Sequence, residues 1–247
     1  MFVMYIYIFV VGIVLGSFLN VVILRVPEDK SIIYPPSHCT NCGNRLKIID
    51  LIPIFSYVFL GGKCRYCKEK ISPIYPLIEF INGIVYLYVF YTNGISWLSL
   101  QYSLLFSVLL VISMIDYRTQ LVDDKIIIFG FVLMILFEVI NKGFTKQLFD
   151  NLYGALLGGG IIALIVIITH GMGEGDIEIF SLTGFVLGFR LTLLALWLSF
   201  VIGGVVAILL LVLKIKNRKD AIAFGPYICF GSYIALLYGN EIMKLIF

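Results

Sequence analysis

The sequence predicts an all-α polytopic membrane protein of about eight transmembrane helices, with a small cytoplasmic zinc-ribbon-like loop after the first helix. Of its 247 residues, 61% are apolar and only 13% are charged, about half the charged share of an ordinary soluble domain. The mean hydropathy is +1.04. These values exclude a soluble globular protein. This apolar composition predicts that membrane lipid surrounds the protein. The net charge of +3 is too small to indicate a nucleic-acid partner.

Long apolar runs define the spans, since a membrane-crossing helix needs roughly 20 apolar residues. The predicted spans are residues 1–24, 74–92, 95–115, 126–140, 151–169, 177–190, 191–213 and 221–240. The segment 177–190 is short for a span, but it preserves the charge asymmetry of the loops. With eight spans and both termini outside, the cytoplasmic loops carry 14 of the 18 lysines and arginines, in accord with the positive-inside rule. Without that segment, the basic cluster between Lys214 and Lys219 would move outside.

Three regions follow from these spans: a first transmembrane helix (1–24), a cytoplasmic loop (25–73) and a helical membrane domain (74–247). The loop has fewer than fifty residues, too few to build a stable core without disulfides or a bound metal. The sequence predicts no oligomeric state.

Four of the five cysteines lie in this loop, as two CxxC pairs separated by 21 residues. They are Cys39, Cys42, Cys64 and Cys67. This spacing is close to that of a zinc ribbon, and nearby glycines, Gly43 and Gly61-Gly62, suit tight turns around a metal. Four thiolates would close a tetrahedral site, so the Zn²⁺ would be structural. Two disulfides are the alternative, which a cytoplasmic location disfavours.

Two aspartates lie where apolar runs meet loops, and carboxylates in such places indicate function. Asp116 directly follows the run 109–115, and Asp176 ends the glycine-rich segment 171–176. The predicted topology puts both at the cytoplasmic face, where they could share one proton and activate a water between them. The alternative is that each aspartate merely caps a helix or solvates a loop.

Motifs along the whole chain resemble those of the type IV prepilin peptidase family. They are Gly16-Ser17-Phe18-Leu19-Asn20-Val21-Val22, Arg25 and Pro27, the two CxxC pairs, Ile52-Pro53, Ser56-Tyr57, Leu60-Gly61-Gly62-Lys63-Cys64, Tyr75-Pro76-Leu77-Ile78-Glu79, Ile115-Asp116, Gly171-Met172-Gly173-Glu174-Gly175-Asp176 and Phe224-Gly225-Pro226-Tyr227. The set is far more specific than Gly-x-Gly-Asp alone, which also occurs in presenilin-like proteases.

The resemblance implies a multi-pass enzyme of the bacterial cytoplasmic (plasma) membrane with its active site at the cytoplasmic face. Such enzymes cleave the short basic leader from type IV prepilins or pseudopilins and N-methylate the new N-terminal residue with S-adenosylmethionine. Carried over by position, the catalytic aspartates are Asp116 and Asp176. The four cysteines are the family's cysteine tetrad, which is linked to metal binding and to methylation. The expected substrate contacts are the glycines that allow close backbone approach and the acidic groups that attract a basic leader. These residues are Gly173, Gly175, Asp124 and Glu174.

Methyl transfer is implied by the resemblance alone, because no Gly-x-Gly-x-x-Gly motif follows a predicted strand. The candidates for contacts with S-adenosylmethionine are Glu79, Arg25 and Asn20, which are polar groups at or near the cytoplasmic ends of two spans. For Glu79 the alternative, given equal weight, is a purely structural role as a helix-start residue bonded to a neighbouring basic group.

The chain departs from the family pattern in two places. Val122-Asp123-Asp124 replaces the usual Leu-Pro-Asp, and we expect an aspartate to cap the next helix instead. Glu178 stands where the family usually has lysine. This exchange of a cation for an anion near Asp176 predicts a shifted pH optimum or a preference for a more basic leader.

Two functions of other classes stay open at this point. A proton- or cation-coupled transporter could use Asp116 and Asp176, but such proteins usually contain internal repeats, and we find none in the sequence. A non-catalytic scaffold that docks a secretion partner through the zinc loop would leave the two aspartates unexplained.

Overall fold

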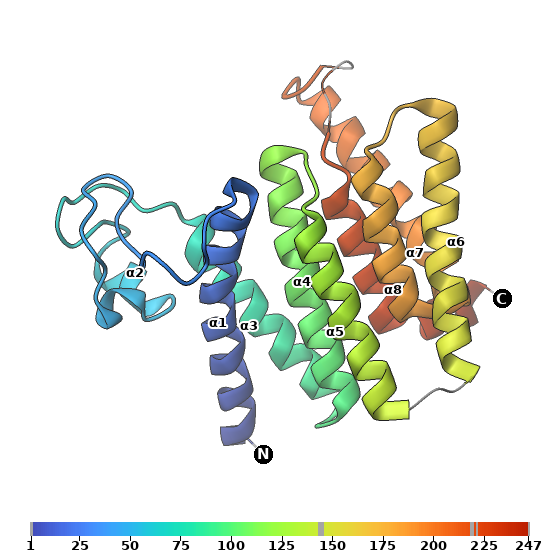
Figure 1. Ribbon diagram of the computed structural model, residues 1–247, viewed down its shortest axis with the longest axis horizontal. Helices are drawn as coiled ribbons and strands as arrows, with labels where there is room; N and C mark the ends of the chain where they lie inside the picture. The colour runs from blue at the N-terminus through green and yellow to red at the C-terminus, as the bar shows by residue number, and fades with distance from the viewer. Residues whose placement is uncertain (1, 143–145, 218–219, 221, 247) are drawn as a thin grey trace. The chain divides into compact units, whose positions relative to one another are not determined.

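The computed structural model describes residues 2–142, 146–217, 220 and 222–246. Within these ranges the chain is helical, and its only β pairing is two isolated bridges, His38 with Arg45 and Lys63 with Lys70. The helices are α1 (Phe2–Arg25), η1 (Val26–Glu28), η2 (Ile48–Leu51), α2 (Phe55–Phe59), α3 (Ile74–Asn93), α4 (Trp97–Thr119), α5 (Asp124–Lys142), α6 (Lys146–Thr169), α7 (Glu174–Val212) and α8 (Gly225–Ile246) (Figure 1). The predicted all-α class is confirmed.

Among the described residues, five helices are long and apolar enough to cross a membrane. They are Phe2–Glu28, Ile74–Asn93, Trp97–Thr119, Gln147–Thr169 and Glu174–Val212. The predicted spans 126–140 and 221–240 coincide largely with α5 and α8, which are not among the five. The count of eight spans therefore stays a prediction, as does the topology. Part of its evidence, Arg218 and Lys219, lies outside the described residues.

The chain divides into two compact units, Met1–Ser107 and Val108–Phe247. In the first unit α1 packs against α3 (Figure 1). A Cβ on Gly12 would lie 2.8 Å from the Gly83 Cα, so the missing side chains let the two backbones approach closely, as small residues do in membrane helix pairs. The amide of Asn82 donates to the Gly12 carbonyl at 2.7 Å and accepts from the Ser107 hydroxyl at 2.9 Å.

In the second unit, α7 packs against α6 and α8. Its helical geometry is broken at Gly188, which has φ 71° and ψ 177°. A Cβ on Gly158 of α6 would meet both the Phe180 carbonyl and the Thr192 methyl, at 2.7 and 3.1 Å, so residues on both sides of the break approach one point on α6. The break lies within the predicted segment 177–190, two residues before its end.

Candidate functional site

Asp116 lies near the end of α4, where its carboxylate meets the first residue of α8. The side chain is buried, and its Oδ2 accepts a hydrogen bond of 2.8 Å from the backbone N–H of Gly225. A Cβ on Gly225 would lie 2.6 Å from the same oxygen. Only glycine therefore allows the start of α8 to approach this carboxylate without displacing it.

Asp176 lies in the first turn of α7 and is buried to the same extent as Asp116. Its Oδ2 accepts a hydrogen bond from the Gly173 N–H at 3.2 Å, and its own N–H donates to the Gly173 carbonyl at 3.2 Å. These reciprocal bonds fix the carboxylate against the helix start. Glycine-173 has ordinary backbone angles (φ −77°, ψ 153°), so the turn does not need glycine at this position.

The second unit brings the two aspartates together. Asp116 and Asp176 lie close enough to interact electrostatically, and both also interact electrostatically with the buried Cys229 of α8. The ends of α4, α7 and α8 thus converge on two buried carboxylates. Each carboxylate accepts a hydrogen bond from one backbone N–H, that of Gly225 for Asp116 and that of Gly173 for Asp176.

The link between α4 and α5 completes the surroundings of Asp176. The side chain of Val122 occupies the space that a Cβ on Gly175 would need. Asp123 caps α5, because its carboxylate accepts from the Lys125 N–H at 2.9 Å and its carbonyl accepts from the Ile126 N–H at 3.0 Å. The predicted aspartate cap is therefore present.

Three further acidic side chains lie at more exposed positions in the first two turns of α5 and α7. Asp124 and Glu174 are exposed. Glu178 is half-buried and interacts electrostatically with Asp124. The sequence predicts that the charge of Glu178 lies next to Asp176. In the structure its electrostatic neighbour is Asp124, whereas that of Asp176 is Asp116.

The four loop cysteines form one cluster in the first unit. Their Sγ atoms all lie within 4.8 Å of one another, and no disulfide joins them. Four sulfurs at about 2.3 Å from a tetrahedral zinc would be about 3.8 Å apart, and the Sγ atoms of Cys39 and Cys67 are 3.8 Å apart. The donor set and its geometry fit a structural Zn²⁺, and the disulfide alternative does not match this arrangement.

The two CxxC pairs adopt the same local fold. In the first, the Gly43 N–H donates to the Cys39 carbonyl at 2.9 Å. In the second, the Lys68 N–H donates to the Cys64 carbonyl at 3.1 Å. The residue that directly follows each CxxC pair has left-handed backbone angles, with φ 69° at Gly43 and φ 62° at Lys68. Gly61 and Gly62, before the second pair, also have left-handed backbone angles (φ 59° and 66°), as expected for a tight turn there. Lys68 fills the position after the second pair that Gly43 fills after the first.

A side-chain pair joins the second CxxC to η2. The Arg65 Nε donates to Asp50 Oδ1 at 2.6 Å, and the Lys47 N–H donates to Asp50 Oδ2 at 3.1 Å. Partial burial acts to raise the pKa of Asp50, but these hydrogen bonds outweigh it and the pKa lies below its usual value. Asp50 is therefore ionised at neutral pH, and the pair fixes η2 against the cysteine cluster.

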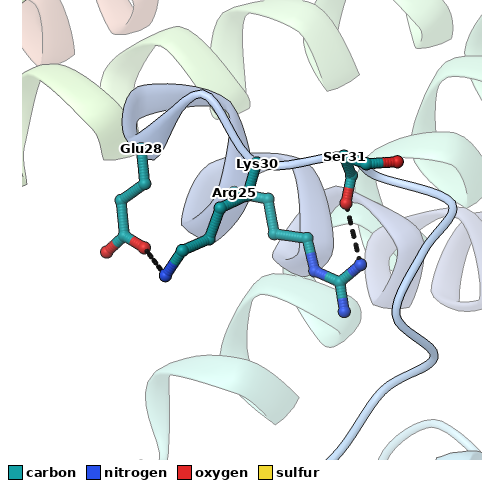
Figure 2. Close-up of polar contacts among 4 residues, drawn as sticks. All are labelled: Arg25, Glu28, Lys30 and Ser31. Carbon is teal, nitrogen blue, oxygen red and sulfur yellow. Dashed lines mark hydrogen bonds and ion pairs between the residues drawn. The ribbon is translucent and has the colours of Figure 1, made fainter.

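The three candidates for contacts with S-adenosylmethionine have partners within the protein. Asn20 Nδ2 donates to the Tyr75 carbonyl at 3.1 Å. Arg25 Nη1 donates to the Ser31 carbonyl at 2.9 Å and points away from the neighbouring pair of Glu28 and Lys30 (Figure 2).

Glu79 is buried in α3 and joins three segments. It hydrogen-bonds the Ser17 hydroxyl of α1 and accepts from the Ile54 N–H at 2.7 Å. These contacts favour the structural alternative for Glu79. Asn20, Arg25 and Glu79 are each bonded within the protein, and their assignment to S-adenosylmethionine stays a prediction that rests on the resemblance alone.

Family models match both parts of the chain. Residues 10–93 match the bacterial peptidase A24 N-terminal domain, and residues 103–208 match the type IV leader peptidase family. No solved structure matches the chain.

Several curated relatives carry the name prepilin leader peptidase/N-methyltransferase. The protein from Bacillus subtilis (strain 168) is 32% identical over 96% of this chain and 95% of its own length. Those from Pseudomonas putida and Pseudomonas aeruginosa are 33% and 32% identical, each over 94% of this chain and 90% of their own length. With matches of this extent, the chain is an integral membrane protein that belongs to the type IV leader peptidase family.

Proposed function

We propose that this protein cleaves the leader peptide from type IV prepilins or pseudopilins and N-methylates the new N-terminal residue. The observation that carries the peptidase half is the pair of buried carboxylates, Asp116 and Asp176, brought together from α4 and α7. The relatives' names support both halves, and for methyl transfer with S-adenosylmethionine they are the only support. The names of these relatives do not support the transporter alternative.

In the proposed cleavage, the two aspartates share one proton and hold a water molecule between them. The ionised carboxylate takes a proton from this water as it attacks the scissile carbonyl, and the protonated one donates to the departing amine. The N–H groups of Gly225 and Gly173 each bind one carboxylate oxygen. This arrangement fixes both groups before substrate binds, which is what preorganised catalysis requires.

The acidic side chains around the pair suit a basic leader. Asp124, Glu174 and Glu178 would attract its lysines and arginines at the membrane surface, while the apolar helix that follows the leader stays in the bilayer. The substrate backbone can approach Asp176 at Gly173, which is exposed. At Gly175 the side chain of Val122 already occupies the space beside the backbone. We place this site at the cytoplasmic face of the plasma membrane, as the charge asymmetry of the loops indicates.

For the cysteine loop we propose a bound structural Zn²⁺, held by Cys39, Cys42, Cys64 and Cys67. Four thiolates leave no open coordination position, so the metal would stabilise the loop and not take part in cleavage.

Intact-mass spectrometry of a prepilin incubated with the protein in membranes and S-adenosylmethionine tests the proposed function. The expected product lacks the leader and carries one added methyl group. Asp116→Asn and Asp176→Asn should give neither change, while Asp150→Asn, at an exposed position on α6, should give both. Cleavage without methylation would restrict the protein to the peptidase half, and an intact prepilin with the unaltered enzyme would contradict the proposal.

A further inference from the structure

The short helices beside the cysteine cluster expose a large apolar surface outside the predicted spans. We call this surface the η2–α2 face. Its members are Ile48, Ile49, Leu51, Ile52, Phe55, Val58 and Phe59. Ile48 and Phe59 are 86% and 85% exposed, and η2 and α2 contact each other. Apolar side chains gathered in this way outside a membrane span mark an interaction surface.

The position of Ile54 places this face at the level of the membrane surface. Ile54 lies between η2 and α2, and its N–H donates to Glu79 Oε2. Glu79 comes five residues after the start of α3, a candidate membrane span, which corresponds to about 7.5 Å along the helix axis. The junction of η2 and α2 is therefore held beside the first turns of a membrane helix.

Basic groups lie next to the apolar face. A hollow of about 460 Å³ borders α2, and its lining includes Tyr57, the exposed Lys63 and Lys70, and Pro73, the residue before α3. Lysines beside an exposed apolar surface are the pattern of segments that lie in the interface of an anionic membrane.

We propose that the η2–α2 face inserts into the headgroup region of the same bilayer that α1 and α3 cross, with Lys63 and Lys70 binding the phosphates of anionic lipids. The cysteine loop is then a membrane-surface module, docked through apolar side chains and lysines and fixed internally by the Arg65–Asp50 pair. This inference is independent of the proposed catalytic roles, because every residue in it lies in the first unit.

Fluorescence quenching by brominated lipids tests the insertion. The chain has two tryptophans, so Trp97→Phe and Trp197→Phe give a background into which one probe is introduced. Phe59→Trp probes the face, and Tyr66→Trp, on the second CxxC turn, is the matched control. In full-length protein in vesicles of brominated phosphatidylcholine and phosphatidylglycerol, we expect Phe59→Trp to lose fluorescence and shift to shorter wavelength, and Tyr66→Trp to change little.

Equal quenching at the two positions, or none at residue 59, would overturn the insertion. The insertion would also be overturned if brominated lipid did not quench Phe59→Trp but a prepilin peptide with an attached quencher did. The face would then bind substrate. Vesicles without phosphatidylglycerol should quench Phe59→Trp less, and Lys63→Gln/Lys70→Gln should remove this difference. The same quenching in both lipids would overturn the role of the two lysines. Unchanged zinc content shows that each variant retains the folded loop.

Discussion

Gly225 and Asp116 are in direct contact, although 109 residues separate them: the glycine N–H donates to the carboxylate, and a side chain on residue 225 would collide with it. The start of α8 thereby sets where one of the two proposed catalytic oxygens lies. A glycine outside the aspartate pair can therefore control cleavage, by positioning Asp116.

Gly225→Ala should reduce the kcat of leader cleavage by about 100-fold, the size of loss that a displacement of about 1 Å causes in a preorganised site. Gly204→Ala in α7 is the matched control, because a Cβ there meets no atom within 4 Å. Steady-state cleavage of a prepilin peptide measures both variants. Wild-type kcat in Gly225→Ala would show that the position of Asp116 does not depend on this contact.

The two glycines before Asp176 should respond differently to alanine. Gly175→Ala forces a Cβ into Val122 and should lower the free energy of unfolding by about 1–3 kcal/mol, as overpacking does. The added Val122→Ala should recover most of this loss. A Cβ on Gly173 would lie 3.9 Å from Asp176 Oδ2, an ordinary contact distance, so Gly173→Ala should leave stability unchanged. A rise in its KM with kcat unchanged would report a substrate contact.

Thermal unfolding in detergent and peptide kinetics provide the two measurements. Equal destabilisation by both alanines, or no recovery in the double variant, would contradict the packing of Val122 against Gly175.

Glu178→Lys should weaken the attraction of the acidic side chains for a basic leader. We expect KM to rise several-fold for a leader with several lysines and little for a neutral one, with the difference shrinking at high salt because salt screens charges near the protein surface. Glu178→Gln should give an intermediate value. Identical KM ratios for the basic and neutral leaders in wild type and Glu178→Lys would contradict this role.

Metal analysis should find one zinc per chain, lost in Cys42→Ser and Cys67→Ser and kept in Cys229→Ser. Gly43→Ala should weaken zinc binding by roughly tenfold, because a left-handed backbone costs a residue with a side chain about 1–2 kcal/mol. Lys68→Gly should bind zinc at least as tightly as wild type. Chelator competition measures the zinc affinities. Tighter zinc binding by Gly43→Ala than by Lys68→Gly would contradict the matching geometry of the two turns.

Features with a local cause could be predicted from the sequence. Apolar runs gave helices at the predicted places, since a segment in lipid must satisfy its own backbone hydrogen bonds. The cap at Asp123 followed from the same local chemistry, because its acceptor lies two residues from the donor.

Features that depend on distant contacts could not be predicted. Phe224-Gly225-Pro226-Tyr227 was visible as a motif, but only the fold brings Gly225 to Asp116. Lysine is not a typical turn residue, so the left-handed backbone of Lys68 could not be predicted from its type. The available clue was its position directly after the second CxxC, which matches that of Gly43 after the first. Likewise, the partners of Glu79 come from α1 and the loop and not from a neighbouring basic residue.

The most direct test of the central claim is whether Asp116 and Asp176 act as one unit. The kcat/KM of leader cleavage is measured for Asp116→Asn, Asp176→Asn and the double variant, with zinc content and thermal unfolding confirming that each is folded. If the pair shares one water, either single change should remove nearly all activity and the double variant should be no worse than the singles, as for other catalytic groups that act together. Independent, multiplying losses, or substantial cleavage by either single variant, would contradict the two-aspartate mechanism.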